Sequence, residues 1–454
     1  MVVEYLENNR ESWKSNAGFI LAAAGSAVGV GNLWRFPHMM GSNGGFWFLV
    51  IYIIFTLLLG IPVLLGELTI GRYTQLSPVG AYSKIRKRSG FVGVLAILSP
   101  FLIMTYYGVV GGWALNYSFS YMSSAASIDF NELVIFGSFG FGVWHPILWN
   151  VLFMSIVWAV CIFGAKGIEK ASKIMMPALF VLLLAVIVRS VTLPGAAAGV
   201  RFMFLETGGF SMSAIPAALG QVFFSLSLGM GAMITYGSYL GKQEILPKNT
   251  AIVAGLDTGV AILAGFAIFP AVFAMGGEPG SGVGLTFITL PGVFDAMPFG
   301  AAIAAAFFLL VFFAALTSGI SLVEACASFT IDTWKWKRKF SVTLLCVLFS
   351  ILAIPNSMSL VAEGTIFSGG NFLGTGMPIF DAVDFFANNI LLPIGGLLMC
   401  VVVGWCWKPY NAVSEIERTP GYSFKLKTAW SWIIKILAPI LILFVLASQF
   451  VGYN

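Results

Sequence analysis

The segment Gly25–Pro37, GSAVGVGNLWRFP, decides how this chain should be interpreted. It lies inside an apolar stretch, residues 16–40, that is long enough to cross a bilayer as one helix. Each glycine costs a helix about 1 kcal/mol relative to alanine, and the centre of this stretch carries Gly25, Gly29 and Gly31. A continuous helix is therefore disfavoured where a membrane span requires one.

An asparagine and an arginine follow these glycines. Asn32 and Arg35 would lie near the bilayer midplane, where a charged side chain costs at least about 2.5 kcal/mol. A packing face of small residues would explain Gly25 and Gly29, which are four residues apart. It does not explain Gly31 or the two polar residues. The segment therefore predicts a helix that is interrupted at its centre around a binding site.

A second apolar stretch, residues 214–240, has the same kind of interruption. A Gly-Met-Gly sequence at residues 229–231 lies in its middle, and Ser225 and Ser227 come just before it. The two stretches are the first and sixth candidate spans, and this odd separation inverts the second copy in the membrane. Paired interruptions in inverted halves indicate a transporter site at the midplane, built from unpaired carbonyl and N–H groups.

Composition places the whole chain in a membrane. Of its 454 residues, 59% are hydrophobic and only 9% are charged, and the mean hydropathy is +0.93, whereas soluble chains carry about 25% charged residues. This excludes a soluble enzyme, a disordered chain and a secreted disulfide scaffold. Windows of about 20 apolar residues predict an all-α polytopic protein with eleven transmembrane helices, at residues 16–40, 46–70, 91–122, 145–163, 168–188, 214–240, 250–275, 298–331, 340–356, 378–406 and 429–451.

The loops between these spans have an asymmetric charge. Loops on the side of the N-terminus hold 20 of the 24 lysine and arginine residues, and the other side holds only Arg189 and Arg201. Arg35 and Lys435 lie within spans. Because loops rich in lysine and arginine stay in the cytoplasm, we expect a cytoplasmic N-terminus and an extracytoplasmic C-terminus.

Three further polar groups lie inside apolar spans, and each has two interpretations. Thr317 and Ser318 either ligate a cation or bond back to carbonyls of their own helix. Asp257 is either a functional carboxylate or one half of a buried ion pair. Tyr106 and Tyr107 either offer a hydroxyl to a ligand or pack as aromatic rings. The residues alone leave these alternatives open.

With these residues the chain resembles the neurotransmitter:sodium symporter family, and in particular its short bacterial amino-acid transporters. The resemblance rests on Gly25–Pro37 and on residues 43–45, 221–239, 284–291 and 316–318. The family implies a single transporter domain over residues 1–454 whose first and sixth spans are unwound at the centre. It consists of two inverted five-helix repeats, at residues 1–188 and 214–406, and an additional span at 429–451.

The resemblance also implies ligands for two co-transported sodium ions and an amino acid. One sodium site would use Ala27, Asn32, Ser225 and Asp257, and the other would use Gly25, Val28, Ala314, Thr317 and Ser318. The amino acid would be bound by Ala27, Val30, Gly31, Ile103, Tyr107, Val110, Phe224, Ser225, Ser227, Met230, Gly319 and Leu322. An outer gate would pair Arg35 with Asp384, and an inner gate would pair Arg10 with Asp332, supported by Trp13, Ser238 and Tyr239.

The expected substrate follows from one position in the first span. Amine transporters of this family carry an aspartate where this chain has Gly29, so the substrate must bring its own carboxylate. The expected pocket is aliphatic, aromatic and thioether, with Gly319 leaving room, which favours hydrophobic and aromatic L-amino acids. A small amino acid such as glycine or alanine is the alternative. A channel or a membrane enzyme is disfavoured, because the polar groups converge on one occludable site and form no catalytic pair of carboxylates.

We also expect uptake that does not need chloride. Chloride ligands of animal members would correspond to Tyr52, Gln221, Ser225 and position 261, which is Ala261 here, and Asp257 stands where an asparagine is common. A fixed carboxylate can replace the anion, and it can carry a proton on the return step. The resemblance implies the bacterial inner membrane as location and the bilayer and a small molecule as partners, with no nucleic acid and no obligate protein partner.

Overall fold

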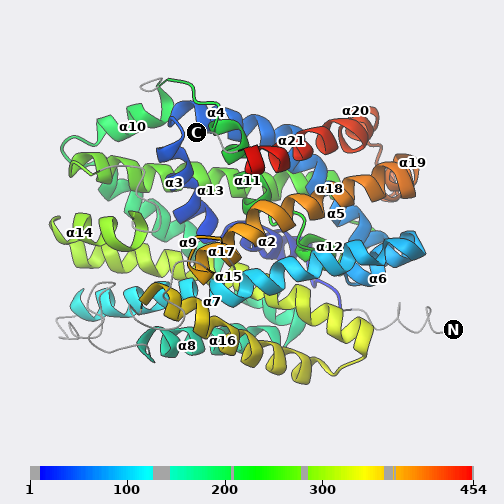
Figure 1. Ribbon diagram of the computed structural model, residues 1–454, viewed down its shortest axis with the longest axis horizontal. Coiled ribbons are helices and arrows are strands. Elements are labelled where there is room, and N and C mark those ends of the chain that lie inside the picture. The colour runs from blue at the N-terminus through cyan, green and yellow to red at the C-terminus, as the bar shows by residue number, and fades with distance from the viewer. Residues whose placement is uncertain are drawn as a thin grey trace.

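The computed structural model describes residues 11–125, 144–205, 209–277, 285–361, 372 and 375–451. Every regular element in these residues is a helix, and Figure 1 shows the helices running largely side by side along the long axis of the molecule. The predicted all-α membrane class is confirmed.

Eight long apolar helices have the length and composition to cross a bilayer in the described part of the chain. Several of these eight spans contain short π-helical segments, η2, η7, η8 and η9, and such a span carries more than one label. They are α4–η2–α5 (Phe46–Thr74), η3–α7 (Lys87–Ala125), α9 (Gly164–Val191), α13 (Leu246–Ala274), α15 (Gly300–Trp334), α16 (Arg338–Val361), α17–η7–α18–η8 (Ile379–Trp407) and α20–η9–α21 (Lys427–Val451).

Three further apolar segments bring the arrangement into line with the eleven predicted spans. The first is a bent pair, α2 (Asn16–Ala27) and η1–α3 (Gly31–Ser42), whose halves meet at 47°. The second is α8 (Trp144–Cys161), and the third is α11 (Ala214–Ser225) followed by α12 (Ala232–Gly237). These segments are short or broken, so the count of eleven is compatible with the structure without being fixed by helix length.

Among the eight long apolar spans the most buried is the one formed by α15, which packs along α7 at the centre of the bundle (Figure 1). In its most apolar window 78% of the residues are buried, whereas only 22% are buried in the corresponding window of α20–α21. A helix that is apolar on all sides and mostly buried belongs inside the bundle, and one that is equally apolar but exposed faces lipid. The central helices α7 and α15 therefore frame the interior in which the broken helices meet.

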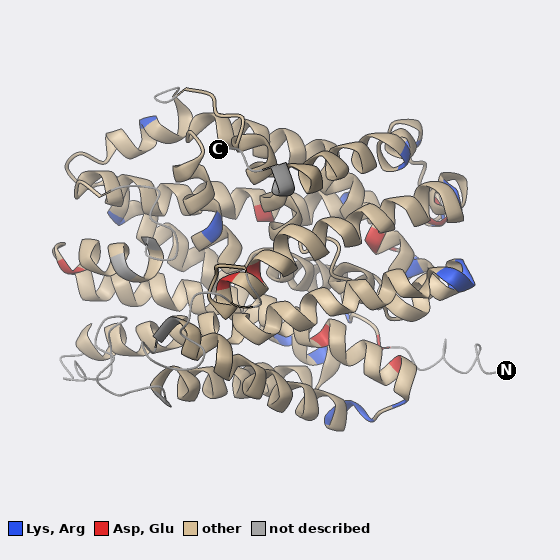
Figure 2. Ribbon diagram, viewed as in Figure 1, with Lys and Arg blue, Asp and Glu red and all other residues tan. Residues whose placement is uncertain are grey.

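Shorter helices complete the loops at both ends of the bundle. They are α6 (Pro78–Ile85), α10 (Ala197–Phe204), η5 (Leu285–Thr289), α14 (Leu290–Asp295) and α19 (Pro409–Ile416). The segment η5–α14 is folded onto the bundle, because the buried Phe287 ring packs against Trp113, Tyr117 and Phe308. Figure 2 shows most lysine and arginine positions toward the end that carries the N-terminus, as the asymmetry of the loops predicted.

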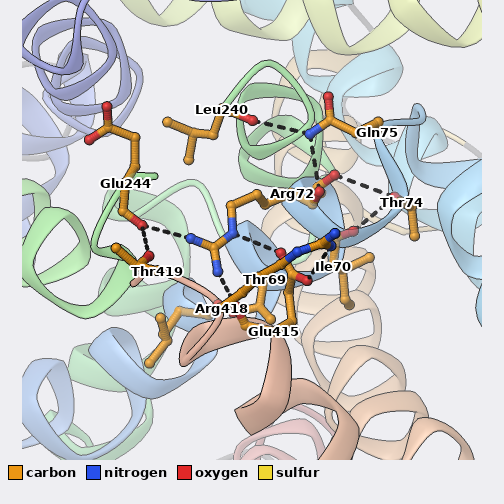
Figure 3. Close-up of polar contacts among 12 residues, drawn as sticks. Thr69, Ile70, Arg72, Thr74, Gln75, Leu240, Glu244, Glu415, Arg418 and Thr419 are labelled. Atoms are coloured by element: carbon orange, nitrogen blue, oxygen red, sulfur yellow. Dashed lines mark hydrogen bonds and ion pairs between the residues drawn. The ribbon is translucent and has the colours of Figure 1, made fainter. Parts of the chain in front are cut away.

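A buried ion pair anchors α19 to the end of α5, as Figure 3 shows. Arg72 is completely buried, and its Nε lies 2.9 Å from Oε1 of Glu415. Its Nη1 donates to the carbonyl of Glu244 at 2.7 Å, and its Nη2 donates to the carbonyl of Glu415. A buried guanidinium needs this full set of acceptors. The network fixes α5, against which α12, the second half of the broken sixth span, is packed.

Candidate functional site

The first span is broken between Ala27 and Gly31. Helix α2 ends at Ala27, Val28 has an extended backbone (φ −73°, ψ 90°), and η1 starts at Gly31. Gly29 lies in the break, where a side chain would overlap the hydroxyl of Ser318. Glycine is required here because α15 approaches closely, as a packing face of small residues allows. The predicted central interruption is confirmed.

The sixth span is broken between Ser225 and Ala232, where α11 ends and α12 starts. Three residues in the break have positive φ, namely Ser227 at 54°, Gly229 at 77° and Gly231 at 70°. Glycine adopts this region without the steric cost that other residues incur, so the Gly-Met-Gly sequence directs the break. The prediction that spans 1 and 6 are unwound at the centre is confirmed.

A polar cluster at the first predicted sodium site joins the two broken helices to α13. The Asn32 amide donates to Oδ1 of Asp257 at 2.7 Å and to the Ser225 hydroxyl at 3.2 Å. The Ser225 hydroxyl donates to both oxygens of Asp257, at 2.8 and 2.9 Å, and the Tyr52 hydroxyl lies 3.3 Å from Oδ2. Three of the four predicted ligand residues thus meet around a fully buried carboxylate.

The second predicted sodium site lies between α2 and α15. The Thr317 hydroxyl lies 3.1 Å from the carbonyl oxygens of Phe313 and Ala314 and 3.5 Å from that of Val28. A side chain at Gly25 would touch Thr317 as well. The structure therefore brings together four of the five predicted residues. The fifth, Ser318, donates instead to the carbonyl of Ser26 at 3.2 Å.

A central cavity of about 20 Å³ lies between the two breaks, which is space for about one water molecule. Four serines form its polar side: the hydroxyls of Ser227 and Ser318 donate to the Ser26 carbonyl, and the hydroxyls of Ser26 and Ser321 bond at 2.8 Å. The remaining lining residues are Ala27, Gly29, Gly31, Ile103, Tyr107, Phe224, Met230 and Leu322. None of these twelve side chains is charged.

Four predicted substrate residues do not line this cavity. Gly319 faces Phe153, whose ring a side chain there would touch at 3.3 Å, so it does not enlarge the cavity, and Ser318 lines it instead. Val110 is buried elsewhere along α7. Ser225 points to Asp257. Val30 contributes its backbone, whose N–H donates to the Tyr107 hydroxyl at 3.4 Å.

The predicted outer ion pair is not formed in this structure. Arg35 donates from Nη2 to the Asn389 side chain at 3.3 Å, and its guanidinium lies 4.9 Å from the centre of the Phe224 ring. Asp384 accepts from the amide of Asn388 at 2.7 Å. Arg35 and Asp384 are therefore both engaged, each with another partner.

At the opposite end, the predicted inner gate is described only in part, because Arg10 lies outside the described residues. Trp13 donates from Nε1 to the Tyr236 carbonyl at 3.0 Å and from its backbone N–H to the Tyr239 carbonyl at 3.2 Å. Asp332 accepts from the Ser77 N–H at 2.7 Å, and the Ser238 hydroxyl donates to the Thr235 carbonyl at 2.6 Å. The start of α2 is thus held against the end of α12.

Sequence reasoning missed a charged network next to this inner contact. Arg338 makes ion pairs with Glu11 at 2.7 Å and Glu324 at 2.8 Å, and the Tyr239 hydroxyl donates to Glu324 at 2.6 Å. Burial raises the pKa of Glu11, and the Glu324 carboxylate raises it further, whereas Arg338 lowers it. Glu324 lies in an apolar span, and a carboxylate there was the available signal.

Sequence reasoning also missed Glu67, which is another carboxylate in an apolar span. It is 1% exposed in α5, and its Oε1 accepts the backbone N–H of Gly229 at 2.7 Å. The break in the sixth span leaves this N–H without a helical partner, and the buried carboxylate satisfies it. Glu67 therefore supports the unwound conformation from outside the cavity.

A bundle of membrane-spanning helices with two broken helices around one buried polar cavity defines a secondary transporter. A family model described as the sodium:neurotransmitter symporter family matches residues 10–129 and 126–454. The sodium-dependent transporter YhdH of Bacillus subtilis is 35% identical to this chain over 449 residues, which is 97% of either chain. The sodium- and chloride-dependent taurine transporter of Rattus norvegicus is 28% identical over 94% of this chain and 76% of its own.

The structure is also similar to a solved one. The crystal structure of MhsT in complex with L-phenylalanine matches with a TM-score of 0.86 and 40% identity, over 97% of this chain and all of the other. The chain belongs to the sodium:neurotransmitter symporter family. It is an integral membrane protein and a sodium-dependent symporter, and it is not an enzyme.

Proposed function

We propose that this symporter takes up hydrophobic and aromatic L-amino acids with two sodium ions and without chloride. The observation that carries the substrate class is the uncharged cavity between the breaks. Its serines and the backbone of the two breaks suit the ammonium and carboxylate of an amino acid, and the side chains of Ile103, Met230 and Leu322 suit an apolar substituent. MhsT, whose structure contains L-phenylalanine, supports the same class by similarity.

The substrate carboxylate would lie at the break of the first span. At the point where η1–α3 starts, the Val30 N–H donates to the Tyr107 hydroxyl at 3.4 Å, and both groups could instead donate to a bound carboxylate. The start of a helix carries partial positive charge and free N–H groups, which favour an anion. Gly29 places no carboxylate there, so an amine without its own acid group would lack a counter-charge.

A small amino acid such as glycine or alanine remains the second candidate, and the cavity volume of about 20 Å³ favours it. An aromatic side chain requires Phe224 and Met230 to move outward. Methionine is unbranched and adapts to different shapes. The ring of Phe224 is partly buried and covers Gly31, so its rotation would enlarge the cavity toward Arg35.

Coupling of amino-acid uptake to sodium would arise from the two sodium sites, since each site uses groups from separate elements. Asn32, Ser225 and Asp257 come from three different helices, whereas Val28 lies in the break of the first span and Thr317 lies in α15. An ion that needs all of its ligands together favours the conformation in which these helices are apposed. A substrate carboxylate next to the first ion would make amino-acid and sodium binding mutually favourable.

Asp257 supports the proposed independence from chloride. Its two oxygens already occupy the space among the hydroxyls of Ser225 and Tyr52 where an anion would otherwise be held. Ala261 offers no further hydroxyl. One permanent negative charge would therefore balance the sodium ions. The taurine transporters similar to this chain are named as chloride-dependent, so the property must be tested in this chain itself.

The alternating-access cycle would use the two ends of the bundle. We infer that Arg35 leaves Asn389 and pairs with Asp384 when the outer side closes, and that Arg10 and Asp332 separate when the inner side opens. The repeats at residues 1–188 and 214–406 would move against each other, since each begins with a broken helix. A cytoplasmic N-terminus in a bacterial inner membrane, with an extracytoplasmic C-terminus, accords with the charge of the loops.

The test is uptake into proteoliposomes that contain the purified chain. Labelled phenylalanine should accumulate with an inward sodium gradient and not with potassium, and unlabelled leucine, phenylalanine and tryptophan should compete better than glycine or alanine. Strong competition by glycine and alanine alone would establish the second candidate. Replacing chloride by gluconate should leave uptake unchanged, and Asp257→Asn should lose uptake in gluconate. A wild-type requirement for chloride would refute the role of Asp257.

A further inference from the structure

A lysine-rich groove lies at the end of the bundle that carries the N-terminus, between the end of α8, the start of α9 and the residues before α2. Its volume is about 660 Å³. Lys166, Lys170 and Lys173 line it from α9, where their spacing places them on one helical face, and Lys14 lines it from the chain that leads into α2. The groove is separate from the cavity between the broken helices.

The described residues that line this groove carry more positive than negative charge. Lys173 pairs with Glu169 at 2.6 Å, and Glu169 also accepts from the Lys14 backbone N–H and the Ser15 hydroxyl. Lys14, Lys166 and Lys170 make no ion pair with a carboxylate in the described part of the chain. Four lysines and one glutamate therefore line the groove. The occupant should be an anion.

The rest of the groove is apolar and faces the membrane. Phe163 and Ile174 line it and are 66% and 64% exposed. Only a third of the most apolar window of α9 is buried in the bundle, so much of this helix faces lipid. The lysines lie in the first three turns of α9, where the span begins, which is the depth of the lipid headgroups. The occupant should therefore combine an anionic head with a hydrocarbon chain.

We propose that this groove binds one anionic phospholipid, such as phosphatidylglycerol. Its phosphate would lie among Lys14, Lys166 and Lys170, and one acyl chain would lie along Phe163 and Ile174. Basic pockets between helices at the membrane surface bind such headgroups, and each lysine contributes by its charge.

A bound lipid would also act on the contact between α2 and α9. Glu169 joins these helices by accepting from Lys14 and Ser15, and the Ser15 hydroxyl caps α2 through the Gly18 N–H at 3.0 Å. A phosphate that contacts Lys14 and Lys166 together spans the same two elements. The lipid would therefore stabilise the arrangement in which the start of the broken first span rests on α9.

The experiment measures lipid binding, which does not depend on the proposed transport function. Delipidated protein is titrated with phosphatidylglycerol, or with phosphatidylcholine of the same chains, and bound lipids are counted by native mass spectrometry. The groove variant is Lys166→Gln with Lys170→Gln. The control is Lys242→Gln with Lys248→Gln, which removes the same charge from exposed positions at the same end of the bundle that do not line the groove.

One phosphatidylglycerol should bind more tightly than any phosphatidylcholine. At about a factor of five for each lysine, the groove variant should bind it about 25-fold more weakly, and the control should match the wild type. Equal losses in both variants, or equal binding of the two lipids, would overturn the proposal. Water-soluble glycerol phosphate that competes as well as the lipid would show a soluble anion site and would overturn it too. Equal thermal unfolding midpoints will show that all variants are folded.

Discussion

The substitution Thr317→Val tests the second sodium site directly. Valine has the shape of threonine, so the change replaces one hydroxyl by a methyl group on α15. That hydroxyl lies 3.1 Å from the carbonyls of Phe313 and Ala314 in its own helix and 3.5 Å from the carbonyl of Val28 across the break. The Thr317 hydroxyl thus has two roles open to it. It can bond to carbonyls of its own helix, or it can share a cation with the Val28 carbonyl.

The two roles predict different effects of Thr317→Val on sodium affinity. If the hydroxyl ligates sodium, its loss removes one polar contact to a charged group, worth about 1.5–3 kcal/mol. Sodium affinity should then fall by about 10- to 150-fold. If the hydroxyl only bonds within its helix, the protein should lose about 1 kcal/mol of stability, and sodium affinity should stay unchanged.

Thr69→Val is the matched control. Thr69 is completely buried in α5, and its hydroxyl bonds only within its helix, to the Leu65 carbonyl at 2.6 Å. Radioactive sodium binding to the purified proteins gives the affinity, and thermal unfolding gives the stability. We expect a similar loss of stability in both variants and a loss of sodium affinity in Thr317→Val alone. Equal sodium affinity in the two variants would refute the assignment.

Three further predictions concern the cavity, the scaffold and the outer gate. Gly29→Ala should place a methyl group against the Ser318 hydroxyl. This overpacking should cost about 1–3 kcal/mol and weaken equilibrium amino-acid binding by about 5- to 150-fold. Wild-type affinity would show that the break is not packed as described. Glu415→Ala should leave Arg72 buried without its counter-ion and cost about 3–5 kcal/mol, so an unchanged unfolding midpoint would argue against the network. Asp384→Asn should impair uptake more than folding, and wild-type uptake with normal expression would count against an ion-pair gate.

Much of the fold was accessible from the sequence because its signals are local. Apolar windows identify the spans, since a bilayer requires about 20 apolar residues whatever surrounds them. The breaks were readable from Gly29 and from residues 229–231, because glycine clusters in a span oppose a helix through their own backbone preferences. Asp257 and Thr317 stood out for a related reason, since polar groups are costly in an apolar span.

The assignment of side chains to the cavity required the tertiary structure. Ser318 and Gly319 are adjacent on one helix, but successive residues point about 100° apart, so Ser318 lines the cavity and Gly319 faces Phe153. A span is apolar on every side, and its sequence does not record how it is rotated about its axis. The packing of α15 against α7, α9 and its other neighbours sets that rotation.

The partners of the charged residues were likewise decided by packing. The sequence determined that Arg35, Glu67 and Glu324 lie within apolar spans and must find partners. It did not determine that these are Asn389, the Gly229 N–H and Arg338, because each partner lies in a different span from the residue that it contacts. The spans and their breaks thus follow from the energy of each segment in a bilayer, whereas the contacts that form the site follow from how the segments pack together.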